Sequence, residues 1–379
     1  MNFALTETHT MIRETARKFA EERVAPGSIE RDEKEEFPRE IVRELGELGF
    51  MGMMVPEEWG GAGLDTLSYV IAMEEISRVD ASVGVIMSVN NSLVCYGINK
   101  DGSDDQKERF LRDLAAGRKL GAFALSEPEA GSDASNQHTL AARDGDSYVL
   151  NGTKNWITNG STADLVLVMA ATDRTKGAKG ISTFIVEKGT PGFTVAKKEK
   201  KLGIRSSDTV SLSFTDCRVP AGNRIGAESE GFRFAMKTLE GGRIGIAAQA
   251  LGIARGCLEA SVHYARERKA FDRPIAELQA IQFKIADMAT NIDAARMLMY
   301  KSAALKDAGE PFGAEAAMAK LFASKIAVQA ALEAIQIHGG YGYVREYLVE
   351  RYLRDAKITE IYEGTSEIQR IVIARSLLK

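Results

Sequence analysis

Cysteine and histidine are scarce in this sequence of 379 residues. Its three cysteines, Cys95, Cys217 and Cys257, are widely separated and odd in number. Such a set fits neither a disulfide framework nor the spacing of a zinc site, so we expect a reducing compartment. The histidines are too scattered to form a metal cluster, and we expect no metal site. They are His9, His138, His263 and His338.

The sequence also lacks a charge excess and a long apolar run. Lys and Arg number 49 and Asp and Glu 53, which leaves a net charge of -4. We therefore expect no positive field that would attract nucleic acid or anionic lipid. The nearest approach to a membrane span, residues 244–254, is interrupted and short, so we expect a soluble protein. The first residues lack the basic start and apolar run of a secretory signal.

Several common catalytic signatures are missing. The chain contains no G-x-G-x-x-G after a predicted strand, no G-x-x-x-x-G-K-[ST], no H-E-x-x-H and no G-x-S-x-G. These absences argue against a Rossmann nucleotide site, a P-loop, a zinc protease and a serine hydrolase. A single small binding module is excluded as well, because a chain of this length exceeds what one hydrophobic core serves.

The residue pattern changes twice along the chain. From residue 1 to 120, apolar residues recur at helical spacing, as in Ile12, Ala16 and Phe19. From 121 to 225, short runs rich in β-branched and aromatic residues alternate with turn signals. From 226 to 379, stretches dense in Ala, Leu, Ile and Met predict long packed helices. The order predicts an α+β fold with three domains divided at these positions.

Turn signals predict individual strands in the middle third. Asp144-Gly145 and Asn151-Gly152 are both typical of turns, and we expect strands at 148–150 and 156–158 on either side of the second. Bounded apolar runs predict core strands. These runs are 165–169 and 183–186.

Two local signals concern the helices. Ser103 and Gln106 make a capping box, which predicts a helix that ends at Gly117. Small residues such as Gly245 and Ala248 would let the C-terminal helices approach closely.

Four glycine-rich or polar clusters stand out. They are SEPEAGSD (126–133), WIT (156–158), QIHGG (336–340) and YEGTS (362–366). Singly, each has an ordinary structural explanation: a surface turn, a half-buried strand, a helix ended by glycine, and a capping box formed by Ser366 and Gln369. In the last case a binding role is compatible with the structural one, because a helix N-terminus also attracts phosphate.

Together and in this order, the clusters resemble those of the acyl-CoA dehydrogenases, and the resemblance covers essentially the whole chain. PEEWGG (56–61), RKAF (268–271) and RDAK (354–357) are further hallmarks, while IMSVNNS (86–92) and GRIGIA (242–247) most resemble short-chain, butyryl-type members. The resemblance implies an N-terminal helical domain, a middle β-barrel or sandwich domain with the flavin site, and a C-terminal four-helix bundle with the catalytic base and the oligomer core.

The family binds FAD without a Rossmann fold, between the middle domain and the bundle. By resemblance, the residues along the flavin and its pyrophosphate are Phe123, Leu125, Ser126, Ser132, Trp156 and Thr158. A flat indole and a hydroxyl near the reactive nitrogen suit that task. The adenine half would be completed from a neighbouring subunit of a homotetramer, a dimer of dimers, by Arg268, Phe271, Gln279, Gln336, Gly339 and Gly340. Thr365, Ser366 and Glu367 would lie beside the phosphates.

The family's reaction removes an α proton from an acyl-CoA thioester while a hydride leaves the β carbon. Glu363 matches the base of short- and medium-chain members, and its backbone N–H would bind the thioester carbonyl. Substrate would displace water and raise the pKa of Glu363 toward neutrality. In isovaleryl and long-chain members the base stands where this chain has Gly242. The expected substrate contacts are Ser132, Glu240, Arg243, Gly364 and Arg375.

Three residues depart from the family pattern. Glu240 replaces the usual aspartate beside the CoA, while Glu129 and Asp272 stand where glycine is common. For Glu129 and Asp272 we expect modest effects on affinity, because neither position carries a reacting group.

The resemblance implies dehydrogenation of short-chain acyl-CoA to trans-2-enoyl-CoA in fatty acid or branched amino acid breakdown, with electrons passed to electron-transfer flavoprotein. Alternatives are a short-branched or medium-chain dehydrogenase, an oxygen-using flavin oxidase or monooxygenase, and a helical scaffold that has lost its cofactor. Glu363 argues against a monooxygenase, and the intact set of Trp156, Arg268 and Gln336 argues against a scaffold. The expected location is a bacterial cytoplasm or a mitochondrial matrix.

Overall fold

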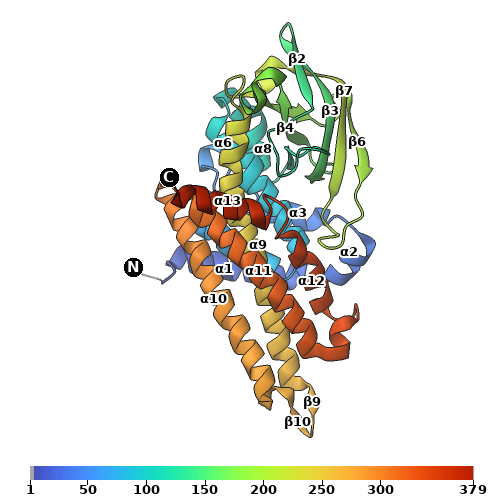
Figure 1. Ribbon diagram of the computed structural model, residues 1–379, viewed down its shortest axis with the longest axis vertical. Coiled ribbons are helices and arrows are strands. Elements are labelled where there is room, and N and C mark those ends of the chain that lie inside the picture. Colours follow the sequence, from blue (N-terminus) through green and yellow to red (C-terminus); the bar gives the residue numbers. More distant parts are fainter. Residues whose placement is uncertain (1–3, 379) are drawn as a thin grey trace.

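The computed structural model describes residues 4–378 and confirms the α+β prediction (Figure 1). The N-terminal third is helical. Its helices are α1 (Glu7–Phe19), α2 (Ser28–Lys34), α3 (Arg39–Glu47), α4 (Thr66–Ser77), α5 (Ala81–Ser88), α6 (Tyr96–Asp101), α7 (Asp104–Gln106) and α8 (Arg112–Ala115), with π-helical stretches at Ala20–Val24, Val89–Cys95 and Lys107–Leu111. The Ser103–Gln106 capping box and a left-handed Gly117 are both present, as predicted.

The middle third forms one eight-stranded sheet. Its strands are β1 (Gly121–Ala124), β2 (Leu140–Asp144), β3 (Ser147–Thr158), β4 (Leu165–Ala171), β5 (Ile181–Glu187), β6 (Phe193–Lys198), β7 (Thr209–Pro220) and β8 (Arg224–Ile225). The order is β6-β7-β3-β2-β4-β5-β8, and β1 pairs in parallel with β4. The predicted core strands at 165–169 and 183–186 are confirmed as β4 and β5.

Both faces of β4 are buried, which explains its unbroken apolar run. Alternate residues Leu165, Leu167 and Met169 join the core shared with the helices. Val166 and Val168, which point the opposite way, join a second core enclosed by the sheet itself. The sheet is therefore fixed to the helical parts through one face and keeps its own core on the other.

The predicted turn at Asn151-Gly152 is wrong. β3 runs through it as a single strand, with a register shift against β7 between Leu150 and Gly152. A Cβ on Gly152 would lie 2.5 Å from Oγ1 of Thr139, so glycine is needed for a close approach within the sheet and not for a hairpin. The turn signal at Asp144-Gly145, by contrast, does connect β2 to β3.

The C-terminal third contains three long helices and two shorter ones. They are α9 (Gly231–Glu267), α10 (Gln279–Asp307), α11 (Gly313–His338), α12 (Leu348–Ile358) and α13 (Ser366–Leu377), and a small hairpin of β9 (Lys269–Ala270) and β10 (Arg273–Pro274) follows α9. In Figure 1 this hairpin forms the end of the molecule opposite the sheet. We propose that the domains divide after residues 120 and 225, because loops join helix to strand at both points.

Small residues on α9 let it pack closely against α4. A Cβ on Gly245 would lie 2.5 Å from Oη of Tyr69, and one on Gly252 would lie 2.6 Å from the carbonyl oxygen of Glu74. Any side chain at these positions would push the two helices apart. Close helix approach at Gly245 is therefore confirmed, but its neighbour is α4 of the N-terminal third and not another C-terminal helix.

Among residues 4–378, one helical stretch is long enough and apolar enough to cross a membrane by composition. It is Ala81–Asp101, and not the 244–254 run that the sequence suggested as the nearest candidate. In the fold, 94% of its apolar window is buried inside the protein. A core helix passes the same test of length and composition, so the stretch is weak evidence for a span.

A buried ion pair anchors the loop that follows β1. The ammonium of Lys154, on β3, lies 2.7 Å from Oε1 of Glu127 and donates to the carbonyl oxygen of Leu125 at 3.0 Å and to the side-chain oxygen of Gln137. Both charged side chains are almost wholly buried. Glu127 also accepts hydrogen bonds from two backbone N–H groups of the returning chain. The start and end of the 125–139 loop are thus tied to one lysine.

We expect Glu127→Gln to destabilise the protein by about 3 kcal/mol, because removing one partner of a buried pair leaves the other charge uncompensated. The measurement is the free energy of unfolding in urea. Glu129→Gln is the matched control: this neighbour is exposed and lies 3.6 Å from the exposed His138, so its loss should stay within about 0.5 kcal/mol. Equal effects of the two variants would contradict the anchoring role of Lys154.

Candidate active site

Glu363 lies in the loop between α12 and α13, where the backbone takes two successive left-handed conformations. The φ angle is 51° at Glu363 and 93° at Gly364. This turn directs the carboxylate toward α9, where a Cβ on Gly242 would overlap Oε2. The two positions that carry the base in different branches of the resembled family therefore face each other, and glycine at 242 leaves room for glutamate at 363.

One oxygen of the Glu363 carboxylate is buried and has no hydrogen-bond partner. Part of the Glu363 residue reaches the surface, but Oε2 itself is buried and has no hydrogen-bond partner. Burial raises the pKa of Glu363 to about 7, against the opposing charges of Lys320 and Arg243. Burial within the chain therefore already brings this pKa to neutrality, whereas the sequence argument assigned the rise to substrate.

Two buried side chains hold the loop by one carbonyl group. The ammonium of Lys320, on α11, donates to the carbonyl oxygen of Gly364 at 2.7 Å. The side-chain amide of Gln369, on α13, donates to the same oxygen at 2.8 Å. Both side chains are fully buried. The loop around Glu363 is therefore fixed from two helices.

The predicted capping box at Ser366 is wrong. Thr365 is the N-cap of α13, and its hydroxyl accepts from the backbone N–H of Ile368 at 3.3 Å. Ser366 is instead the first residue of the helix, and Gln369 turns back to Gly364. Because Thr365 and not Ser366 caps the helix, the Gln369 side chain is free to donate to the Gly364 carbonyl oxygen.

Sequence analysis missed Lys320 and Lys154. Lys320 follows an alanine-rich helical face, and Lys154 falls on the inward-facing side of β3 with Tyr148 and Leu150. A lysine in register with buried apolar residues needs a buried oxygen partner. That signal was present in the sequence, but its partners could be found only in the fold.

The predicted substrate contacts separate into two sets. Arg243 follows Gly242 on α9 and is buried with its Nε unpaired; Glu240, on the preceding turn, is half-buried. Arg243 and Gly364 adjoin Gly242 and Glu363, which face each other, whereas the Glu240 carboxylate lies near Gly313 at the start of α11. Ser132, in the loop after β1, and Arg375, in the last turn of α13, are exposed on other elements.

A β-bulge brings together two of the four clusters. The register of β3 shifts between Lys154 and Ile157, and Trp156 within the shift has a φ of 65° and is 62% exposed. The backbone N–H of Asn155 donates to the carbonyl oxygen of Ser126 at 2.9 Å. The bulge therefore turns the indole outward and joins it to the loop after β1. Phe123 and Leu125 are buried beside this junction, while Ser126 and Thr158 are half-buried.

Six of the remaining predicted cofactor residues lie at the far end of the C-terminal helices, whereas Thr365, Ser366 and Glu367 lie at the start of α13. Phe271 and Asp272 form the tip of the β9–β10 hairpin with φ angles of 54° and 65°, and Phe271 is 85% exposed. Such a two-residue turn needs positive φ at both positions, which aspartate tolerates. Arg268 precedes this hairpin and Gln279 begins α10; Gln336, Gly339 and Gly340 lie at the end of α11. In Figure 1 the β9–β10 hairpin lies at the opposite end of the molecule from β3, the strand that carries Trp156.

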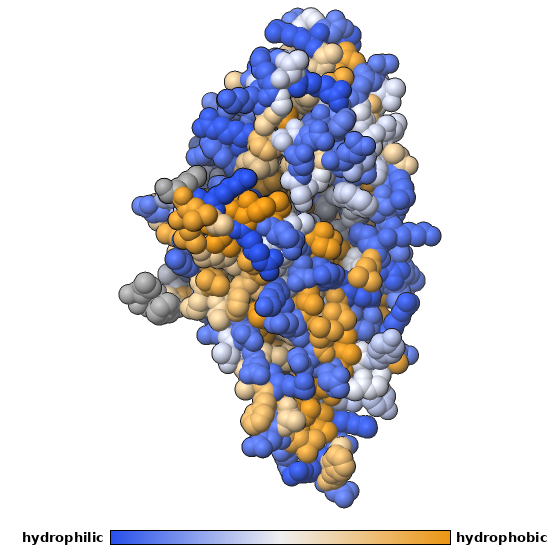
Figure 2. Space-filling model, viewed as in Figure 1, coloured by the Kyte–Doolittle hydropathy of each residue, from blue (hydrophilic) through white to orange (hydrophobic). Residues whose placement is uncertain are grey.

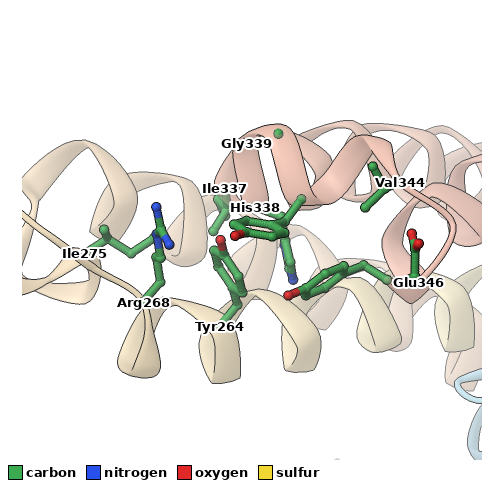
Figure 3. A pocket seen from close by; sticks show the side chains of 11 residues that line it. Tyr264, Arg268, Ile275, Ile337, His338, Gly339, Val344 and Glu346 are labelled. Atoms are coloured by element: carbon green, nitrogen blue, oxygen red, sulfur yellow. The ribbon is translucent and has the colours of Figure 1, made fainter.

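A pocket of about 740 Å³ opens where the ends of α9 and α11 meet (Figure 3). Tyr264 stacks on His338 with ring centroids 4.2 Å apart, and Arg268 lies 5.5 Å from the ring centre of Tyr341. Burial lowers the pKa of His338, so its imidazole is neutral at physiological pH. The walls are thus flat, aromatic and bordered by one cation. The lining also includes Ile275, Ile337, Gly339, Gly340, Val344, Glu346 and Tyr347.

Comparisons with known proteins agree with this architecture. The acyl-CoA dehydrogenase N-terminal, middle and C-terminal domains match residues 6–118, 122–217 and 229–378. The chain is 51% identical over 379 residues to "Acyl-CoA dehydrogenase, short-chain specific" of Clostridium acetobutylicum, with all of both chains covered. It is 55% identical to "Short-chain specific acyl-CoA dehydrogenase, mitochondrial" of Rattus norvegicus, covering 99% of this chain and 91% of that one.

Solved structures are equally similar. Butyryl-CoA dehydrogenase from Megasphaera elsdenii matches with a TM-score of 0.99 and 49% identity over all of both chains. A chain in the structure described as "Electron transferring flavoprotein of Acidaminococcus fermentans: Towards a mechanism of flavin-based electron bifurcation" matches with a TM-score of 0.99 and 52% identity, again over all of both chains. The resemblance of the four clusters is thereby confirmed, and the chain belongs to the acyl-CoA dehydrogenase family of flavin-dependent oxidoreductases.

Proposed function

We propose that this chain dehydrogenates short-chain acyl-CoA thioesters to trans-2-enoyl-CoA, with FAD as cofactor and Glu363 as base. The observation that carries the proposal is the buried, unpartnered Oε2 of Glu363 opposite Gly242. The names of the similar proteins support a short-chain substrate, and the butyryl-type stretches at 86–92 and 242–247 agree with them.

The Glu363 side chain removes the α proton of the thioester. Its pKa of about 7 makes the carboxylate both available and basic at neutral pH. Among residues 4–378, the backbone N–H of Glu363 has no acceptor, so it is free to bind the thioester carbonyl and stabilise the developing enolate. The flavin, when bound, accepts the hydride from the β carbon.

The residues at the sheet fit a flavin. The bulge at Trp156 presents a flat, exposed indole, and the half-buried Thr158 supplies a hydroxyl at the same edge. Glu129 and Asp272, two of the three departures from the family pattern, are exposed and carry charge into solvent. These placements support the assignment of Phe123, Leu125, Ser126, Ser132, Trp156 and Thr158 to the flavin half of FAD.

A second copy of the chain would complete the site. Six of the predicted cofactor residues lie too far from Trp156 to bind the same cofactor within one chain, which supports a homotetramer that shares its cofactors. These residues are Arg268, Phe271, Gln279, Gln336, Gly339 and Gly340. Apolar side chains gather over α13 and the long helices (Figure 2), including the exposed Leu332, Ile371 and Leu377. Patches of this kind mark protein interfaces. The flat pocket of Figure 3 then suits an adenine ring.

Electron-transfer flavoprotein is the proposed electron acceptor. The match to a chain in the Acidaminococcus fermentans structure supports this partner. An oxygen-using oxidase or monooxygenase remains the alternative on this scaffold, and the first experiment below separates the two.

Anaerobic titration with butyryl-CoA, octanoyl-CoA and 2-methylbutyryl-CoA tests the substrate class. Butyryl-CoA should bleach the flavin absorbance at the lowest concentration, because the chain resembles butyryl-type members. Strongest bleaching by either of the others would correct the chain length or branching. A yellow protein that none of the three bleaches, or oxygen consumption under turnover, would move the function toward another substrate or an oxygen-using relative.

Glu363→Gln should lower kcat by about 10²- to 10⁴-fold while the flavin stays bound, because the amide cannot accept the proton. In the unchanged enzyme kcat should rise as pH increases through about 7, since only the ionised carboxylate is a base and its pKa is raised to that value. Stopped-flow flavin reduction across pH measures both. Near-normal reduction in Glu363→Gln would show that another group is the base.

Gly242→Ala should lower the rate of flavin reduction by about 100-fold, because the added methyl group displaces the carboxylate from its productive position. Gly241→Ala is the matched control: its Cβ would lie 3.4 Å from the flexible end of Lys306 and away from Glu363. The measurement is flavin reduction by butyryl-CoA. Equal rates in the two variants would mean that Glu363 does not depend on the space at Gly242.

A further inference from the structure

Lys320 is a buried cation that the family motifs do not include. It lies on α11 among small residues, with Ala316, Ala319 and Ala323 buried around it. Its side chain is fully buried and its ammonium makes a 2.7 Å hydrogen bond to the Gly364 carbonyl oxygen. Burying an ammonium is costly unless it is paired and hydrogen-bonded, and Lys320 has the Gly364 carbonyl oxygen as acceptor but, among residues 4–378, no carboxylate within ion-pair distance.

Lys320 lies near the proposed base, Glu363, but does not bind its carboxylate. Lys320 and Glu363 form no direct ion pair, and Oε2 of Glu363 keeps its free lone pairs. A lysine bound to the carboxylate would compete with the substrate proton. Because Lys320 donates instead to the carbonyl oxygen of Gly364, its charge acts on the Glu363 carboxylate through space, in a low-dielectric region where the field is strong.

We propose that Lys320 is a positioning residue for the base: its ammonium holds the Gly364 carbonyl so that Glu363 keeps its left-handed turn toward α9, and its positive charge keeps the Glu363 carboxylate ionised near neutral pH. The inference rests on the proposed role of Glu363 as base. Gln369 binds the same carbonyl but carries no charge, so it shares only the first of these tasks.

The charges around the pair support this assignment. The groups that act on Glu363 or Lys320 are Arg243 from α9, Tyr69 from α4, Glu360 and Tyr362 from the loop, and Glu367 from α13. Burial raises the pKa of both tyrosines, which stay neutral. Burial lowers the pKa of Lys320 to about 8, so it remains a cation at pH 7. Of the two cations that lower the pKa of Glu363, Lys320 has the larger effect.

The test is the pH dependence of flavin reduction in Lys320→Met. Without the cation, the carboxylate takes up its proton more readily, so the midpoint of the acid limb should move up by about one pH unit. Lys320→Arg keeps a cation and a donor and should bring the midpoint back toward that of the unchanged enzyme. If Lys320→Met does not fold, Lys320→Gln keeps a donor without the charge and should show the same upward shift.

Lys284→Met is the matched control. This lysine lies on α10, pairs with Glu333 of α11 and makes no contact with the loop of Glu363, so its midpoint should not move. A Lys320 variant that loses activity equally at every pH, with an unmoved midpoint, would overturn the proposal and leave only a structural role.

Infrared titration separates this inference from the proposed function. The carboxylic acid band that disappears in Glu363→Gln reports the protonation of Glu363 without turnover. A midpoint of this band that is unchanged in Lys320→Met overturns the inference. If the midpoint shifts in Lys320→Met while Glu363→Gln retains turnover, the coupling of the two side chains is supported. Only the assignment of Glu363 as the base is then overturned.

Discussion

A group that must take a proton from carbon has to be removed from water and yet left without a partner. In this chain we propose that this requirement falls on Oε2 of Glu363, which is buried and has no hydrogen-bond partner. Desolvating a carboxylate is expensive, and a direct ion pair would offset the cost but disable the base. The fold instead distributes the compensation: α9 supplies space at Gly242 and charge at Arg243, α11 supplies Lys320, and α13 supplies Gln369. The proposed base therefore depends on the packing of three helices, and its own loop determines only the direction in which the side chain points.

The same device occurs twice. Lys154 binds the carbonyl oxygen of Leu125, where the loop after β1 begins, and Lys320 binds the carbonyl oxygen of Gly364, where the loop before α13 ends. Each lysine is fully buried, and each lies under a loop that carries residues proposed to contact flavin or substrate. They differ in their charge balance: Lys154 has Glu127 as a direct partner, whereas Lys320 has none within bonding distance. The charge of a paired lysine is largely balanced by its partner, so Lys154 holds the backbone and has little electrostatic effect on other groups. An unpaired one also changes the protonation of its neighbour, which is the basis of the role proposed for Lys320.

Much of this could be predicted from the sequence, and the failures have a common cause. The α, β, α order follows from periodicity, and the clusters that include Trp156 and Glu363 follow from residue types in a fixed order. Asn151-Gly152 was misjudged because a glycine needed for close approach to Thr139 has the same local signature as one needed for a turn. The capping box at Ser366 was misjudged because Gln369 is used in a tertiary contact. Lys320 and Lys154 were missed because their partners are distant in sequence: each lysine lies in register with buried apolar residues, but the groups that it binds are found only in the fold.

The position of the second set of predicted cofactor residues bears on assembly. Arg268 and Phe271 lie at the end of the molecule opposite the sheet, and Phe271 projects its ring into solvent from a hairpin whose two central residues both have positive φ. A large apolar side chain in a strained, exposed turn is costly for an isolated chain. Burial of the hairpin tip against the cofactor of another copy would explain this cost, because the Phe271 ring then leaves water when FAD and the second subunit bind. If copies of the chain share FAD as proposed, cofactor binding and subunit association stabilise each other by linkage, and both sites are incomplete in an isolated chain.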